Sequence, residues 1–289
     1  MKLSLGTVQF GLNYGITNHS GMTPAEEVKE ILDYAKENSI NHLDTAPSYG
    51  NSEQVIGNLI NHDFIINTKT PHFNSCEIGE QDIDVLENTF FQSLKNLKQT
   101  CLEGIYIHNI HDMRKKNAEK LFQKLESLKK QGYVRKIGFS VYDGEDIGFL
   151  LKYYDFDLVQ IPINIFDQRF LVNNYLVELK NRKIEIHARS IFLQGILLSQ
   201  IKELPPHFTN NTAIFKKYEN FLKENQLTKL DGAIHFVNNI KEIDYMIVGV
   251  NHVQQLKEIL ESYNKKIVIE DDVHLLSINN PDLIDPRRW

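Results

Sequence analysis

The sequence predicts an α/β fold of the closed (β/α)8 type, a TIM barrel, formed as a single domain over residues 1–289. Short apolar stretches typical of buried strands alternate with amphipathic helical stretches about eight times. The connections are short, and no repeat, low-complexity tract or linker divides the chain. A doubly wound sheet shares this alternation, but the G-x-G-x-x-G pattern expected after its first strand is absent. A closed barrel is therefore favoured.

The amino-terminal elements illustrate the prediction. A first strand is expected over residues 3–7, followed by a glycine-rich loop. A helix is expected to begin at Thr23, a good N-cap, with Pro24 in the first turn and Glu26 completing a capping box. Apolar residues then recur at helical spacing and form a buried stripe, namely Val28, Ile31, Leu32 and Ala35. The second strand is expected over residues 40–44.

The same alternation continues towards the carboxyl end. Further strands are predicted over residues 64–69, 102–108, 136–140, 158–161, 184–189 and 245–249. Further helices are predicted over residues 83–97, 117–131, 143–154, 170–181, 212–225, 230–239 and 253–263. Residues 280–289 show no regular period. They are expected to form an ordered tail near the active-site rim that ends in the only tryptophan, Trp289.

Composition excludes several classes of protein. The net charge is -6 with both signs interspersed, so no basic face for nucleic acid is expected. Cys76 and Cys101 are the only cysteines, which argues against a disulfide framework and suits a reducing compartment. No signal-peptide region and no apolar run of the roughly 20 residues needed to span a membrane is found. We therefore expect a cytoplasmic protein, and leave its oligomeric state open.

The stretch from His42 to Glu53 joins the end of a buried strand to a polar loop. The strand is expected to end at Asp44, and the loop to present Tyr49. A helix then begins near Ser52, with Ser52 or Asn51 as its cap. Asp44 and Tyr49 thus lie where a strand gives way to a helix, and barrel enzymes keep their chemistry at that edge.

Two further polar residues end the next two predicted strands, Lys69 on the third and His108 on the fourth. Neighbouring strand ends converge on one rim of a barrel, so an acid, a phenol, an amine and an imidazole are expected to meet there. A free tyrosine, with a pKa of about 10, is a poor proton donor to a carbonyl oxygen. We expect the Lys69 ammonium to lower the pKa of Tyr49, and Asp44 to keep Lys69 charged.

At these residues the sequence resembles the aldo-keto reductases. Residues 43–57, LDTAPSYGNSEQVIG, follow the signature D-T-A-x-x-Y-G-x-S-E-x-x-[IL]-G of that family. The resemblance covers nearly the whole chain, including the Pro281-to-Trp289 tail found in one branch. It implies that Tyr49 protonates the carbonyl oxygen of an aldehyde or ketone, that Lys69 and Asp44 tune it, and that His108 orients the carbonyl. The hydride would come from a nicotinamide cofactor, NADPH by family default with NADH not excluded.

The resemblance also implies a set of cofactor-binding residues. They are Gly6, Thr7, Asp44, Ser140, Gln160, Arg189, Ser190, Phe192, Gln194, Gly195, Gly249 and Gln255. Independently, barrels often bind phosphate through the loops after the seventh and eighth strands, which these residues include. Four positions depart from the family pattern. Val141 stands where the family usually has an Asn, and Arg189 stands where it commonly has an aromatic residue that stacks on nicotinamide. Gln255 replaces a basic residue that binds the 2'-phosphate, and Ile259 replaces an Asn that binds adenine.

Other interpretations of the sequence stay open. The same barrel could bind a nucleotide as a regulatory or interaction protein without turnover. His108 and His111 could form a metal pair, but no further ligands at suitable spacing accompany them, so no metal is expected. His111 and Asp112 are instead expected on a loop near the pocket. The substrate is expected to be a small carbonyl compound, and a sugar-derived one is a guess from the family. Its specificity is expected to lie in residues 8–15, 72–80, 109–116, 196–211 and 277–289.

Overall fold

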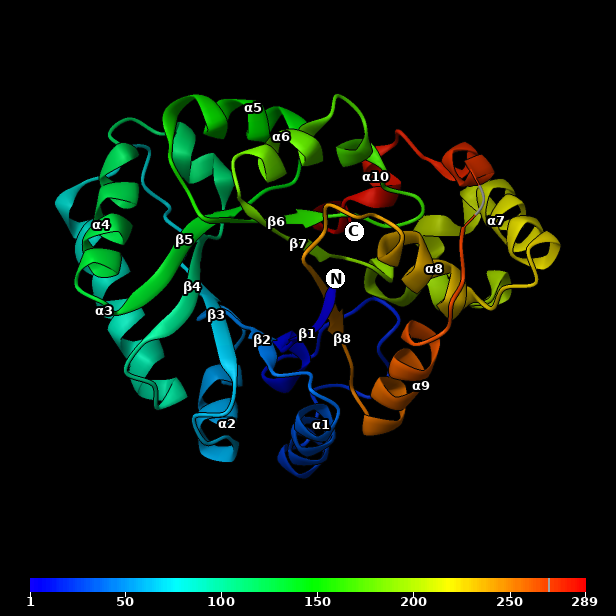
Figure 1. The fold of residues 1–289 in the computed structure, drawn as a ribbon, viewed down its shortest axis with the longest axis horizontal. Coiled ribbons are helices and arrows are strands. Elements are labelled where there is room, and N and C mark those ends of the chain that lie inside the picture. The colour runs from blue at the N-terminus through cyan, green and yellow to red at the C-terminus, as the bar shows by residue number, and fades with distance from the viewer. Residues whose placement is uncertain (270) are drawn as a thin grey trace.

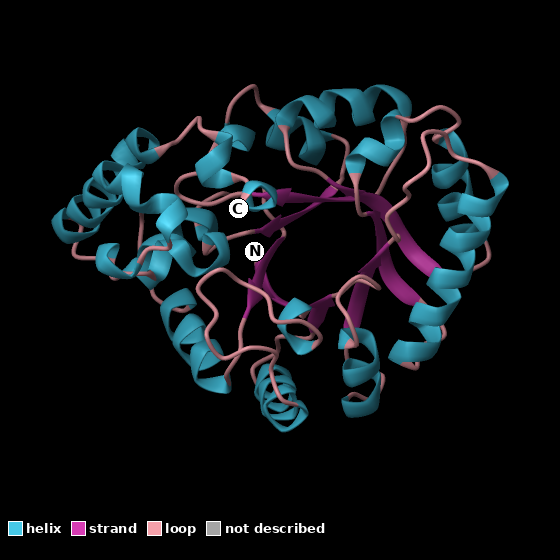
Figure 2. Cartoon of the chain, turned by 180° about the vertical axis from the view of Figure 1, so that it is seen from behind, coloured by secondary structure: helices cyan, strands magenta, loops and turns pink. Residues whose placement is uncertain are grey.

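Eight parallel strands close into a barrel in chain order, and the last strand pairs with the first. Figure 1 and Figure 2 show the strands at the centre with the helices around them, in a computed structural model that describes residues 1–269 and 271–289. The strands are β1 (Lys2–Gly6), β2 (His42–Asp44), β3 (Ile65–Lys69), β4 (Leu102–Ile107), β5 (Val134–Ser140), β6 (Leu158–Pro162), β7 (Glu185–Arg189) and β8 (Tyr245–Gly249). The predicted barrel is confirmed.

Helices follow the strands and cover the outside of the barrel (Figure 2). They are α1 (Ala25–Glu37), α2 (Ser52–Leu59), α3 (Glu80–Leu97), α4 (Glu119–Lys130), α5 (Gly144–Tyr153), α6 (Tyr175–Asn181), α7 (Thr212–Glu224), α8 (Lys229–Asn238), α9 (Val253–Tyr263) and α10 (Pro281–Ile284). The predicted stripe of α1 is buried and packs in the apolar core between strands and helices. Among the described residues, no helix is long and apolar enough to cross a bilayer.

Two local predictions were wrong. The first turn of α1 has Pro24 at its N-cap and no side-chain cap, because Thr23 accepts a hydrogen bond from Asn251 instead. The helix expected from residue 170 is a 3-10 turn that breaks off before α6, since Asn173 and Asn174 both adopt left-handed backbone angles, with φ of 58° and 56°.

The carboxyl end is an ordered tail, as expected, and it also contains regular elements that its sequence pattern did not indicate. It contains α10 and a following 3-10 turn over residues 286–288. Asn280 caps α10 by accepting a hydrogen bond from the Asp282 N–H at 3.0 Å. Trp289 packs its ring at 4.9 Å from that of Phe208, so the only tryptophan stabilises the tail.

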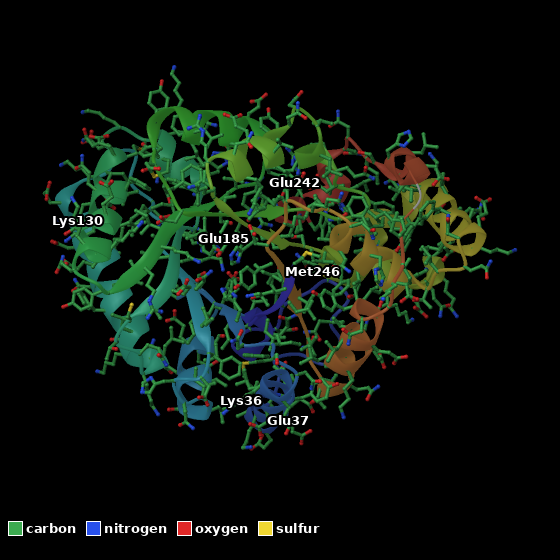
Figure 3. The ribbon with its side chains drawn as sticks, viewed as in Figure 1. Lys36, Glu37, Lys130, Glu185, Glu242 and Met246 are labelled. Atoms are coloured by element: carbon green, nitrogen blue, oxygen red, sulfur yellow. The ribbon has the colours of Figure 1, made fainter. Side chains whose placement is uncertain are left out.

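The inside of the barrel is unusually polar for a packed core. Tyr106 and His187 are fully buried there, and Asn67 donates to the Tyr106 hydroxyl at 3.1 Å. Figure 3 shows Glu185 towards the centre of the barrel, whereas Lys36, Glu37 and Lys130 lie on outer helices. The His187 Nε2 lies 2.7 Å from a carboxylate oxygen of Glu185. The polar interior leads up to the mouth where the strands end.

Candidate active site

The strand register brings the predicted catalytic residues to one mouth of the barrel. Gly6 pairs with Asp44, and Asp44 pairs with Asn67, two residues before the end of β3 at Lys69. His108 directly follows β4. These residues therefore share the carboxyl-terminal rim, as expected from the sequence.

A buried ion pair forms the base of the site. The Lys69 Nζ lies 2.6 Å from the Asp44 Oδ2, and the two side chains are 1% and 5% exposed. Lys69 also donates to the Thr45 carbonyl at 3.0 Å, and Gln160 donates to the other Asp44 oxygen at 2.7 Å. Because both charges are buried and hydrogen-bonded to fixed partners, removing either one would leave an uncompensated charge.

Tyr49 lies directly above this pair. The Lys69 Nζ is 4.9 Å from the centre of the Tyr49 ring, and the His108 ring meets Tyr49 edge-on at 6.1 Å. The loop that carries Tyr49 packs closely on the β1 loop, since a Cβ on Gly11 would lie 2.0 Å from the Tyr49 carbonyl oxygen. Ser52 donates to the Thr7 carbonyl at 2.8 Å and fixes the start of α2 against β1.

The environment of Tyr49 corrects one expectation. We predicted that Lys69 would lower the pKa of the phenol, but burial and the Asp44 charge raise the pKa of Tyr49 well above its usual value, opposed by Arg189. Burial also lowers the pKa of Lys69, opposed by Asp44. The low-dielectric surroundings outweigh the attraction of the ammonium. Tyr49 is therefore fully protonated at neutral pH.

His108 is held as a neutral imidazole. Burial and the Lys69 charge lower the pKa of His108 to about 2, and its Nδ1 is buried without a hydrogen-bond partner. The ring of His72 lies 4.6 Å away and packs against it. The imidazole is therefore uncharged at neutral pH. His108 can thus give a hydrogen bond from a neutral ring, but it is not a source of protons.

A cavity of about 1040 Å³ opens above these residues. Asp44, Tyr49 and His108 line it, whereas Lys69 lies beneath its floor. Every residue that the sequence assigned to the cofactor also lines it, namely Gly6, Thr7, Asp44, Ser140, Gln160, Arg189, Ser190, Phe192, Gln194, Gly195, Gly249 and Gln255. The structure thus brings the two predicted groups together around one space, as large as the biggest typical ligand sites.

The loop after β7 has an unusual backbone. Ser190, Leu193, Gln194 and Gly195 all have positive φ, at 61°, 50°, 53° and 90°. Such conformations are costly for residues other than glycine, and they gather at ligand sites where the surrounding structure enforces them. Successive N–H groups in turns of this kind can form an anion-binding concavity. In this loop the Leu193 and Gly195 N–H groups already donate to the Ser190 and Phe192 carbonyl oxygens, so an anion would have to use other donors.

Two predicted cofactor residues use their side chains within the protein. The Gln194 carbonyl oxygen accepts from the Ile16 N–H at 2.9 Å, which fastens the amino-terminal loop across the cavity. The Gln255 side-chain oxygen accepts from the Asn251 N–H at 2.7 Å and from the N–H of the N-cap residue His252 at 3.3 Å, and so caps α9. Neither role was predicted. The Gln194 contact joins segments 178 positions apart, whereas the Gln255 cap is local to the start of α9.

Several residues that line the cavity lie outside every predicted position, among them Tyr142, Thr17 and Lys229, whereas Arg287 falls in the expected specificity segment 277–289. Tyr14, in the expected specificity segment 8–15, also lines the cavity. Phe10 is core, being 1% exposed, and Trp289 does not line the cavity. Tyr142 follows Ser140 by two residues at the end of β5, a position that marks it as a rim residue in any barrel.

Two of the five expected specificity loops do not contribute to the cavity. No residue of 72–80 or 109–116 lines it. His111 and Asp112 lie on the turn that follows β4 and do not line the cavity: His111 is exposed, and Asp112 is buried with its carboxylate 2.7 Å from the Lys115 Nζ. Within residues 1–269 and 271–289, no three His, Cys, Asp or Glu side chains gather in a way that could hold a metal ion.

The chain belongs to the aldo/keto reductase family, whose model matches residues 2–278. It is 24% identical over 298 residues to the uncharacterized oxidoreductase YqkF of Bacillus subtilis, with 95% of each chain covered. It is 22% identical over 294 residues to D-arabinose 1-dehydrogenase of Saccharomyces cerevisiae, covering 95% of this chain and 86% of the relative.

The fold has solved counterparts in the same family. The holo form of an aldo-keto reductase from Bacillus halodurans superposes with a TM-score of 0.78 at 19% identity, covering 100% of this chain and 95% of that one. Family membership identifies the chain as an oxidoreductase that acts with a nicotinamide cofactor on a small carbonyl compound.

Proposed function

We propose that this protein reduces an aldehyde or ketone to an alcohol, with Tyr49 as the general acid. One observation carries the proposal: the Tyr49 ring lies 4.9 Å from the ammonium of a buried Lys69–Asp44 pair, in a cavity that His108 also lines. Of the two predicted catalytic groups that line the cavity and could donate to a substrate oxygen, Tyr49 and His108, the second is a neutral imidazole without an acidic proton. Tyr49 holds its proton at neutral pH and can release it.

Each residue has a distinct part in the proton transfer. The neutral His108 would hydrogen-bond the substrate carbonyl oxygen and direct it towards the phenol. Tyr49 would give its proton to that oxygen as negative charge develops there. The Lys69 ammonium would stabilise the phenolate left behind, and Asp44 keeps Lys69 charged and in place. This stabilisation exists only once the proton has moved, which is when it lowers the barrier.

The residues around the cavity fit a nicotinamide dinucleotide, which supplies the hydride when it is bound. The loop of left-handed residues after β7, which lines the cavity, would hold the pyrophosphate. Ser140 is 2% exposed and faces the cavity beside the reacting groups, where it would bind the carboxamide. Arg189 lines the same end, and a guanidinium can stack on a flat ring.

The start of α9 supports NADH rather than the family default, NADPH. Residues that would surround the adenosine ribose include Gln255 and Glu258. The Gln255 side-chain oxygen is committed to the helix cap, and Glu258 places a carboxylate at this end of the cavity. A carboxylate accepts from a ribose 2'-hydroxyl but repels a 2'-phosphate.

Oxidation of NADH and of NADPH by the purified protein, with a panel of aldehydes, ketones and sugars, tests the proposal. We expect carbonyl-dependent loss of absorbance at 340 nm, faster with NADH. Quenching of dinucleotide fluorescence without turnover of any carbonyl would favour a binding protein on the same barrel and would contradict the reductase.

A further inference from the structure

The carboxyl-terminal tail places a guanidinium in the cavity at its reacting end. Arg287 lines the cavity, and its guanidinium carbon lies 3.6 Å from the centre of the Tyr142 ring. Arg189 contacts the same ring, at 4.2 Å. Tyr142 follows the end of β5 and lines the same cavity as Tyr49, so Arg287 reaches the carboxyl-terminal rim of the barrel, on which the proposed acid lies.

Arg287 is held in one orientation from outside the cavity. Its Nε and Nη2 donate to the two carboxylate oxygens of Asp285 at 2.8 and 2.5 Å. Asp285 is 7% exposed and does not line the cavity. This contact uses one edge of the guanidinium, and none of the contacts within the described residues uses Nη1. A guanidinium fixed along one edge presents a preorganised second edge to a ligand.

The charges at the reacting end do not balance. Lys69 is paired with Asp44 and Arg287 with Asp285. Arg189 donates to the Val141 carbonyl and the Ser190 hydroxyl, and it has no carboxylate within ion-pair distance among the described residues. Three cations therefore face two carboxylates, and His108 adds no charge. A net positive potential in a cavity favours a negatively charged ligand.

We propose that the physiological substrate is a carbonyl compound that carries an anionic group, a carboxylate or a phosphate, and that Arg287 is the residue that binds this group. The inference rests on the reductase function proposed above and narrows its substrate class. Tyr142 supports the guanidinium from below, and Asp285 sets its direction. The carbonyl would lie at Tyr49, with the anionic group directed towards the tail.

Matched substrates test this assignment. The value of kcat/KM is compared for succinate semialdehyde against butanal, and for glyceraldehyde 3-phosphate against glyceraldehyde. In the wild-type protein the value of kcat/KM for at least one anionic substrate should exceed that for its neutral partner about tenfold or more. The first pair reports a carboxylate and the second a phosphate. Arg287→Met should lower that ratio at least tenfold, mainly through KM, and Arg287→Lys should lower it less because the charge remains.

Arg288 offers a matched control on the neighbouring position. It also pairs with an aspartate, through a 2.9 Å contact to Asp282, but it does not line the cavity. Arg288→Met should leave the ratio within about twofold of wild type. The assignment is overturned if the wild-type ratio of kcat/KM between anionic and neutral substrates is near one. It is also overturned if Arg287→Met lowers kcat/KM equally for both members of a pair, or if Arg288→Met has the same effect as Arg287→Met.

The failure of this inference is distinct from failure of the reductase function. Turnover of the neutral aldehydes without preference for charge would leave the reductase intact and refute the role of Arg287. Should no carbonyl be turned over, calorimetric binding of 4-hydroxybutanoate and of 1-butanol to the protein with oxidised dinucleotide gives the same comparison. If the wild-type protein then binds 4-hydroxybutanoate no better than 1-butanol, or if the preference is the same in Arg287→Met, the assignment of Arg287 is refuted.

Discussion

Lys69→Met is expected to impair both catalysis and stability, by different amounts. At 4.9 Å from the ring centre, the ammonium stabilises a phenolate by about 3 kcal/mol with an effective dielectric constant near 20. That energy corresponds to a fall in kcat/KM of about 10² to 10³. The free energy of unfolding should fall by about 3–5 kcal/mol, because Asp44 is left as an unpaired buried charge.

A double variant separates the two effects. Asp44→Asn combined with Lys69→Met leaves no charge at the base of the site, so it should regain most of the lost stability in urea unfolding while carbonyl reduction stays low. Steady-state rates of dinucleotide oxidation are measured on the same preparations. The reasoning is refuted if Lys69→Met is as stable as wild type, or if the double variant recovers activity together with stability.

Three further predictions follow from the same geometry. Burial and the His187 charge lower the pKa of His42 to about 3, below its unfolded value near 6.5, so stability present at neutral pH is lost as pH falls from about 6.5 towards 3. Over this range the free energy of unfolding of His42→Gln, measured in urea at each pH, should fall by up to about 4–5 kcal/mol less than that of the wild type. An identical dependence on pH in the two proteins would contradict this. Glu258→Lys should shift the ratio of NADPH to NADH efficiency upward by tenfold or more, and an unchanged ratio would place the ribose elsewhere. Gly195→Ala should weaken dinucleotide binding, measured by fluorescence titration, at least fivefold, because φ is +90° there and the new Cβ would lie 2.0 Å from the Thr17 hydroxyl; unchanged affinity would argue against the loop as the phosphate site.

The sequence was informative wherever the barrel itself fixes position. Asp44, Lys69 and His108 could be placed on one rim because parallel strand ends of a barrel share a mouth, whatever the loops do. The amphipathic stripe of α1 was equally predictable, because its spacing follows directly from helical geometry.

Features that depend on distant contacts could not be predicted. Arg287 meets Tyr142 across 145 positions of chain, and nothing local to either residue signals the contact. The break before α6 arises from two asparagines in left-handed conformation, which compete with a helical pattern that extends through them. The ionisation of Tyr49 was predicted in the wrong direction because burial, invisible in the sequence, outweighs the neighbouring ammonium.

The central claim is that the phenol of residue 49 delivers the proton. Single-turnover hydride transfer from pre-bound NADH, followed by stopped flow in wild type and Tyr49→Phe, tests it most directly. The claim predicts a rate at least 10³-fold lower in Tyr49→Phe, with dinucleotide affinity within about twofold of wild type. A variant that transfers hydride at more than a tenth of the wild-type rate would show that another group supplies the proton.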